Sequence, residues 1–114
     1  MSPMQRTLKE LKNRGLMYEI VEHWNSWSKT RKDLFGFADV ITFWANCVVL
    51  IQVTTMSNRS SHMKKIQDHK IAKAWLEHYP HRMIELWCWR KLKEGWKPNV
   101  TRFYPNGTLR VENE

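Results

Sequence analysis

Two polar residues interrupt the most apolar part of the chain, which lies between Arg31 and Thr54. This stretch reads as two adjacent strands, and each carries one polar side chain where a core strand is normally apolar. Asp39 interrupts F-G-F-A-D-V-I, and Gln52 interrupts V-V-L-I-Q-V-T. A buried carboxylate and a buried amide cost free energy unless something compensates them. A hard metal ion such as Mg²⁺ would compensate both, because it takes oxygen ligands from carboxylates and carbonyls.

The order of predicted elements indicates an α/β fold. Apolar periodicity and turn residues predict a helix, three strands, a helix and a strand, followed from about residue 92 by a turn-rich tail with a small hairpin at Asn106-Gly107. The expected ranges are helix 3–14, strands 17–24, 35–44 and 47–54, a polar loop at 25–32, helix 61–77 and strand 82–90. Three consecutive strands and a strand–helix–strand crossover predict a mixed central sheet flanked by helices. A length of 114 residues fits one domain.

The charge of the chain points to an anionic partner. Nineteen Lys and Arg against eleven Asp and Glu give a net charge of +8, which favours nucleic acid or an anionic membrane surface as partner. The alternative is a basic surface with no partner. The longest apolar run, residues 47–51, is too short to cross a bilayer. Cys47 and Cys88 lie in apolar segments, so we expect buried thiols and a reducing, cytoplasmic location.

The two interrupting residues and a nearby threonine are expected to share one edge of the sheet. Period-two alternation puts Gln52 and Thr54 on the same face of their strand, and Asp39 is on the neighbouring strand. A Mg²⁺ ion there would use the Asp39 carboxylate and the Gln52 side-chain oxygen. Such an ion activates water and stabilises charge on a phosphate, and nearby Lys and Arg would hold the phosphodiester.

These motifs resemble the PD-(D/E)XK nuclease superfamily. The resemblance depends on two motifs. The first is R-x-D-L-F-G-x-x-D, whose last residue, Asp39, lies in the second predicted strand, and the second is I-Q-V-T at the end of the third predicted strand. The chain is similar to small phage and bacterial members of this group, which includes Holliday-junction resolvases, over roughly residues 8–90. The resemblance implies a restriction-endonuclease-like core, with Asp39 as the motif Asp and Gln52 in place of the usual Glu. Thr54 stands where the superfamily has its catalytic Lys, which is a departure.

The resemblance also suggests where the missing groups would come from. The lysine can be supplied by the following helix in this superfamily, and Lys65 or Lys64 is then the stand-in; alternatively the pair forms a solvated helix face. An upstream acid is common in the group. Glu22 is the first candidate, followed by Glu10 and then Glu19, although Glu22 also reads as an ordinary surface residue of an edge strand.

Several further residues have two interpretations each. Asp33 is a possible metal ligand or a turn residue before Leu-Phe-Gly. Trp27 lies in the basic loop N-S-W-S-K-T-R-K, where it would either stack on a base or pack against the protein. The residues expected to contact the DNA backbone are Arg31, Lys32, Arg59, Lys64 and Lys65.

The function expected from these features is Mg²⁺- or Mn²⁺-dependent hydrolysis of DNA phosphodiester bonds by an endonuclease. The chain is too short for an elaborate sequence-reading domain, so we expect selectivity for a junction, flap or nick. A homodimer would suit a two-stranded substrate. One alternative is a catalytically degenerate nuclease fold that binds nucleic acid, because fold alone does not confer activity. Another is a small basic protein that binds a host partner.

Overall fold

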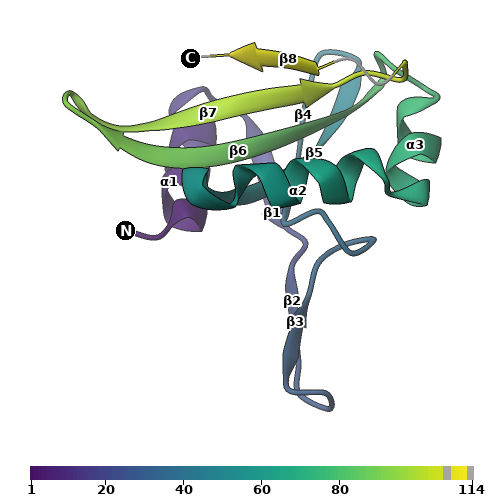
Figure 1. Cartoon of the computed structure of the whole chain (residues 1–114), viewed down its shortest axis with the longest axis horizontal. Helices are drawn as coiled ribbons and strands as arrows, with labels where there is room; N and C mark the ends of the chain where they lie inside the picture. Colours follow the sequence, from purple (N-terminus) through teal and green to yellow (C-terminus); the bar gives the residue numbers. More distant parts are fainter. Residues whose placement is uncertain (107–108, 113–114) are drawn as a thin grey trace.

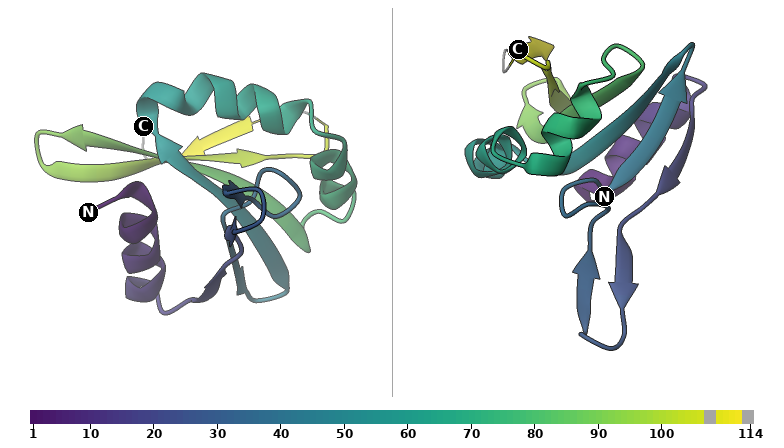
Figure 2. Two further views of the ribbon diagram at one scale, coloured as in Figure 1. Left: turned by 90° about the horizontal axis from the view of Figure 1, so that it is seen from below. Right: turned by 90° about the vertical axis from the view of Figure 1, so that its right-hand side faces the viewer.

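The chain forms three layers, with a central sheet between one helix and a pair of helices (Figures 1 and 2). The computed structural model describes residues 1–106 and 109–112. The helices are α1 (Pro3–Asn13), α2 (Arg59–Gln67) and α3 (Lys70–Leu76), with a 3₁₀ turn, Met56–Asn58, before α2. The strands are β1 (Met17–Ile20), β2 (His23–Asn25), β3 (Thr30–Lys32), β4 (Val40–Trp44), β5 (Cys47–Thr55), β6 (Arg82–Leu92), β7 (Gly95–Phe103) and β8 (Leu109–Glu112).

The main sheet has six strands in the order β1-β4-β5-β6-β7-β8. Strands β5 and β6 run parallel, joined by the crossover through α2 and α3, and the other neighbouring pairs are antiparallel. This confirms the prediction of an α/β fold with a mixed central sheet and helices on it.

Alternating side chains of β5 build a core on each face of the sheet. Val49 and Ile51 join a buried cluster with Leu11 of α1, whereas Leu50 joins a second cluster with Ile66 of α2. The same alternation continues to the end of the strand, so that Gln52 and Thr54 lie on the face covered by α2.

The first helix follows its sequence signals closely. Ser2 and Gln5 form a capping box, Pro3 occupies the first turn, and Gly15 has a φ of 73° just beyond the last turn. The Trp89 indole N–H donates to Thr7 Oγ1 at 2.8 Å, which ties α1 to β6. The N-terminus of α1 is thereby held near the end of β5, where the candidate site lies.

The predicted hairpin between the second and third sequence strands is confirmed, but its first strand is shorter than expected. Strands β4 and β5 pair around residues 45–46. The strand expected at 35–44 begins only at Val40, because residues 34–38 form a tight turn in which Phe35 and Gly36 have φ values of 58° and 84°. The alternating apolar pattern F-G-F-A reflects burial of Phe37 and Ala38 in this turn, not strand pairing.

The segment expected as one strand at 17–24 followed by a polar loop was predicted wrongly. Strand β1 ends at Ile20, and the chain then leaves the sheet to form a separate two-stranded ribbon, β2 and β3. We call residues 23–32 the arm; it projects away from the rest of the molecule (Figure 1). The Asn25 side chain closes the tip by accepting the backbone N–H groups of Trp27 and Ser28. This local turn chemistry was missed in the sequence.

The single helix expected at 61–77 is two helices. Residue His69 interrupts it, because its Nδ1 accepts the Ile71 N–H and thereby caps a new helix, α3. Apolar periodicity continues across the break, since Ile66, Ala72 and Leu76 all belong to the same buried cluster. The periodicity therefore could not reveal the interruption.

The turn-rich tail expected beyond residue 92 is mostly strand. Gly95, with a φ of 122°, closes a tight turn, and β7 pairs with β6 along its whole length. The terminal hairpin is supported by the pairing of β7 with β8, although Gly107 of its predicted turn lies outside the described residues. With the arm, the divided helix and these strands, the observed order of elements differs from the one expected.

Both cysteines are free and buried, as predicted. Burial raises the pKa of the Cys88 thiol to about 11, while the nearby Arg59 guanidinium lowers it less. The thiol therefore stays protonated at neutral pH. Within residues 1–106 and 109–112, no helix is long and apolar enough to cross a membrane.

Candidate functional site

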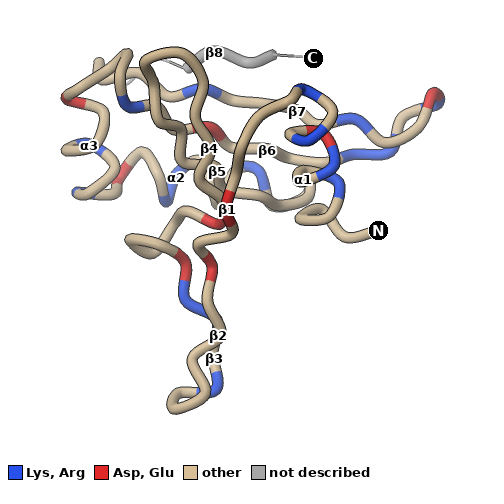
Figure 3. The backbone as a smooth tube through the Cα atoms, turned by 180° about the vertical axis from the view of Figure 1, so that it is seen from behind, with Lys and Arg blue, Asp and Glu red and all other residues tan. Residues whose placement is uncertain are grey.

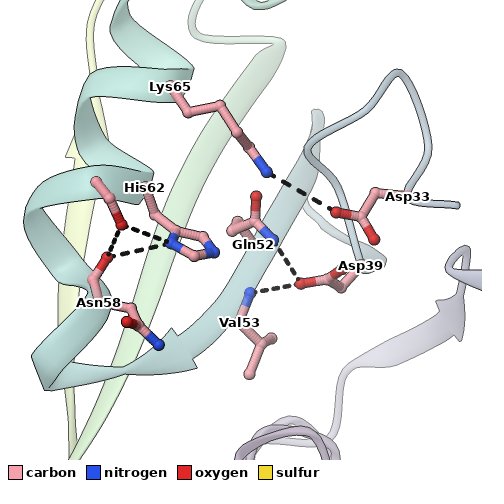
Figure 4. A network of polar contacts seen from close by, with 8 residues as sticks. Asp33, Asp39, Gln52, Val53, Asn58, His62 and Lys65 are labelled. Atoms are coloured by element: carbon pink, nitrogen blue, oxygen red, sulfur yellow. Dashed lines mark hydrogen bonds and ion pairs between the residues drawn. The ribbon is translucent and has the colours of Figure 1, made fainter. Parts of the chain in front are cut away.

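The Asp39 carboxylate is buried at the start of β4 and is held by its neighbours on β5. Its side chain is almost fully enclosed, with Asp39 5% exposed. One carboxylate oxygen, Oδ2, accepts the Gln52 Nε2–H at 2.9 Å and the Val53 backbone N–H at 2.8 Å (Figure 4). The Asp39 backbone N–H also donates to the Ile51 carbonyl at 2.8 Å. Oδ1 accepts neither of the hydrogen bonds from Gln52 and Val53. These two bonds therefore orient the carboxylate and leave Oδ1 for other partners.

Gln52 lies beside Asp39 at the predicted edge of the sheet, but it presents its amide nitrogen, and not its oxygen, to this site. Its Oε1 is buried and has no hydrogen-bond partner among the described residues. A buried carbonyl oxygen without a partner costs about 1–3 kcal/mol. As oriented, Gln52 positions Asp39, and its role as a metal ligand stays a prediction that the unpartnered Oε1 supports.

Three carboxylates converge at this point. Glu22, Asp33 and Asp39 each offer an oxygen, and these oxygens lie within 4.8 Å of one another. Glu22 immediately precedes β2, and Asp33 immediately follows β3, so the two ends of the arm bring their acids to the start of β4. We call these three residues the acidic cluster. Octahedral Mg²⁺, with oxygens at 2.0–2.1 Å, places opposite ligands about 4.2 Å apart, a spacing that the cluster can match.

The crowding of negative charge changes the protonation of Asp39. The pKa of Asp39 is raised from 3.8 to about 8, mainly by burial of its carboxyl group. The Val53 N–H lowers the pKa and offsets part of this shift, whereas a hydrogen bond with Asp33 and the charges of Asp33 and Glu22 contribute to raising it. Without a cation, Asp39 therefore keeps a proton at neutral pH. A divalent cation would favour the ionised form, since nearby positive charge has the opposite effect.

A pocket of about 290 Å³ opens beside the cluster. Its lining includes Glu22, Asp39, Thr54 and the N-terminal residues 2–4 that begin α1. Thr54 is buried two residues beyond Gln52 and reaches this pocket. The three predicted residues of the strand pair, Asp39, Gln52 and Thr54, are therefore brought together by the fold.

Helix α2 directs one of its two adjacent lysines toward the cluster. Lys65 Nζ lies 3.9 Å from Asp33 Oδ2, and its side chain extends across the site in Figure 4. Lys64 is exposed on the same helix. The structure thus distinguishes two lysines that the sequence left as alternatives.

Helix α2 also carries a histidine that was not assigned to the site from the sequence. Figure 4 draws His62 on α2, and its Nδ1 lies 3.1 Å from the Asn58 carbonyl oxygen. His62 precedes Lys65 by three residues, a spacing that puts both on one helix face. This spacing was the signal that could have identified it.

The predicted DNA-contacting residues are scattered over the structure. Arg31 Nη1 donates to Glu22 Oε1 at 3.0 Å, and Lys32 is exposed at the end of β3. Arg59, in contrast, is turned toward β7, where it donates to Asn99 at 3.0 Å and to Thr101 at 3.1 Å. Its guanidinium is thus held by the protein and not directed toward the acidic cluster.

The choice among the upstream acids favours Glu22, which belongs to the cluster. Glu10 pairs with Arg14 on the exposed side of α1, and Glu19 is exposed on β1. Asp33 is a turn residue, because its backbone carbonyl accepts the Gly36 N–H, and its carboxylate also belongs to the acidic cluster; its role as a metal ligand stays a prediction.

Among the described residues, the site thus combines three converging carboxylates, the Gln52 amide oxygen, which is buried without a hydrogen-bond partner, and Lys65 at its margin. Oxygen donors of this kind suit Mg²⁺ or Mn²⁺. Comparisons with protein-family models, with curated proteins and with solved structures found no match for this chain.

Proposed function

We propose that this chain is a Mg²⁺- or Mn²⁺-dependent DNA endonuclease with a PD-(D/E)XK-type core, which hydrolyses phosphodiester bonds. The observation that supports it best is the convergence of Glu22, Asp33 and Asp39 within 4.8 Å. A chain with a net charge of +8 gathers negative charge at this point, and a divalent cation would offset the repulsion.

The residues present fit such a cation. Glu22, Asp33 and Asp39 would hold it, and the buried Gln52 Oε1, which has no hydrogen-bond partner among the described residues, is a further oxygen donor. A bound divalent cation supplies Lewis-acid polarisation of the phosphate and lowers the pKa of the attacking water. Gln52 and Val53 orient Asp39 through their N–H groups, so its carboxylate needs little reorganisation.

The chain also offers a cation of its own for the reacting phosphate. Lys65 Nζ lies 3.9 Å from Asp33 Oδ2. In this proposal Lys65 supplies the positive charge of the motif lysine, which Thr54 at that motif position lacks. Its ammonium would hold a non-bridging phosphate oxygen and stabilise the charge that grows there during cleavage. Selectivity for a junction, flap or nick, and assembly as a homodimer on two strands, belong to the same proposal.

Cleavage assays with an acidic-cluster variant test the proposal. Purified protein is incubated with branched, nicked and linear DNA in Mg²⁺, in Mn²⁺ and in chelator, alongside Asp39→Ala and the control Glu19→Ala. We expect metal-dependent cutting that falls to background in Asp39→Ala and persists in Glu19→Ala, because Glu19 lies outside the cluster. Cutting that survives Asp39→Ala would contradict the site.

The second candidate function is a nucleic-acid-binding module without catalysis. It is favoured by Thr54 in place of the motif lysine and by Gln52 in place of the usual Glu. It predicts salt-sensitive DNA binding with no cutting in any metal, and affinity that tolerates Asp39→Asn but falls with Lys and Arg substitutions.

A further inference from the structure

The arm is an exposed ribbon that ends in tryptophan. Its two strands are short and exposed, apart from a half-buried Asn25, and the ribbon extends away from the sheet in two perpendicular views (Figures 1 and 2). Trp27 at the tip is 95% exposed, and Trp24 on β2 is 61% exposed. Isolated two-stranded hairpins are marginally stable in water, so an exposed ribbon with two uncovered indoles indicates a surface that meets a partner.

The tip is built by its own side chains to present Trp27. Asn25 Oδ1 accepts the Trp27 N–H at 3.0 Å and the Ser28 N–H at 3.2 Å. The hydroxyls of Ser28 and Thr30 are hydrogen-bonded at 2.8 Å. These bonds constrain the backbone around the indole, which lowers the entropy lost when the indole binds a partner.

The charge of the arm matches an anionic partner. Residues 23–32, H-W-N-S-W-S-K-T-R-K, contain the cations Lys29, Arg31 and Lys32 and no acid. Figure 3 shows basic positions along the arm and acidic positions at its base. An aromatic ring among cations is the combination that binds single-stranded nucleic acid, since bases stack on the ring and phosphates meet the cations.

The position of the arm relates this surface to the acidic cluster. Glu22 and Asp33, which flank the arm in sequence, both belong to the cluster, and Arg31 of β3 is paired with Glu22 at 3.0 Å. A strand bound along the arm therefore leads into the cluster at its base. Continuous duplex DNA has its base faces covered by neighbouring bases, so an indole at the tip finds a free face only where bases are unpaired.

We propose that the arm binds unpaired DNA bases next to the cleaved bond, with Trp27 stacking on a base and Lys29 and Lys32 contacting the phosphates. This inference rests on the proposed nuclease function and deepens it: the substrate class is DNA with a single-stranded segment, such as a gap, flap or branch. The arm thus selects the structure of the substrate, whereas the acidic cluster performs the chemistry.

The test measures binding in chelator, separately from cutting. The probes are single-stranded, gapped and continuous duplex DNA carrying 2-aminopurine, whose fluorescence is quenched by stacking. We expect Trp27→Ala to weaken binding of single-stranded and gapped DNA about tenfold or more, to abolish the protein-dependent quenching and to leave duplex binding unchanged. Trp27→Phe should restore most of both signals.

Matched variants control for exposure and charge. Phe43→Ala removes a 50% exposed aromatic side chain from β4, outside the arm, and should leave binding unchanged. Lys29→Ala should reduce the salt dependence of single-strand binding by about 0.7 in log–log slope. Lys73→Ala, at an exposed position of α3, should leave this salt dependence unchanged.

The outcomes separate this inference from the nuclease proposal. Equal affinity and quenching in wild type and Trp27→Ala would overturn the role of the arm, even if Asp39-dependent cutting is observed. An equal loss on gapped and duplex DNA would overturn stacking on unpaired bases. If the wild-type chain cuts no DNA but Trp27→Ala still loses binding and quenching, the binding role of the arm would be supported and the nuclease proposal would be contradicted. A wild-type chain without salt-sensitive affinity for any of these DNAs would overturn the assignment of DNA and indicate a protein partner.

Discussion

At the scale of single residues, the candidate site depends on how Asp39 is held. Its carboxylate is buried, is oriented by N–H donors from Gln52 and Val53, and lies among the negative charges of Glu22 and Asp33. The donors favour the ionised form, whereas burial and the neighbouring carboxylates oppose it more strongly. The folded protein without a cation therefore binds a proton that the unfolded chain releases near pH 4.

This difference predicts how stability changes with pH. The Asp39 pKa is raised from 3.8 to about 8, so its contribution to the free energy of unfolding is complete below about pH 4 and is lost as pH rises toward 8. The loss is at most about 1.4 kcal/mol per pH unit. Asp39→Asn should remove this part of the slope, because the amide does not titrate. Urea unfolding in chelator at a series of pH values measures it, and parallel profiles for the two proteins would contradict the assigned shift.

At the scale of secondary-structure elements, the rotation of α2 decides which basic side chain serves the site. Lys64 and Lys65 are adjacent in sequence, and both are exposed. Among the ion pairs of the described residues, Lys65 Nζ lies 3.9 Å from Asp33 Oδ2, and Lys64 forms no such pair. Consecutive helical residues diverge by about 100° around the axis, so two neighbouring lysines cannot both face the acidic cluster.

The two lysines therefore form a matched pair of variants. If the chain cuts DNA, Lys65→Ala should lower kcat by about a hundredfold or more, because it removes a cation from the charge that develops in the transition state. Lys64→Ala should change kcat little and weaken DNA binding only slightly. Single-turnover cleavage at saturating DNA separates the two effects. Equal losses in both variants would show that the pair acts only through net charge.

At the scale of the whole molecule, the sheet is joined across β6 and β7 by a buried ion pair. Glu85 Oε2 accepts Arg102 Nη2 at 2.8 Å and Nε at 3.1 Å, and Glu85 Oε1 accepts the Trp87 indole N–H at 3.1 Å. Glu85 is buried on the face of the sheet that α1 covers in part, in register with Arg102. This pair links β6, the strand that follows the crossover, to β7, which was expected to be part of a turn-rich tail.

Removing the charge of Glu85 should destabilise the fold. Glu85→Gln removes the buried carboxylate charge that accepts two N–H groups of Arg102 and the Trp87 indole N–H, and we expect a loss of about 3 kcal/mol in the free energy of unfolding. Glu10→Gln, at the exposed pair with Arg14 on α1, is the control and should cost about 0.5 kcal/mol or less. Chemical denaturation of both variants measures the difference; similar losses would mean that burial of the Glu85 pair adds nothing.

Sequence patterns alone were enough to predict the α/β class, the mixed sheet, the hairpin of β4 and β5, and the position of Asp39 and Gln52 on neighbouring strands. Those features follow from local turn signals and from the two-residue period of strands, and both can be read within a few residues. The periodicity could not reveal the break at His69, and it did not separate the turn before Asp39 from a strand, because burial in either structure produces the same apolar pattern.

The composition of the acidic cluster depends on the three-dimensional packing of the chain. Glu22 and Asp33 are eleven positions apart in sequence and meet because the β2–β3 arm closes between them. Lys65 reaches Asp33 from α2, the helix that follows β5 in sequence. Arg59 of the same helix instead donates to Asn99 of β7. Contacts of this kind depend on how separate elements pack, and no local pattern of residues records that packing.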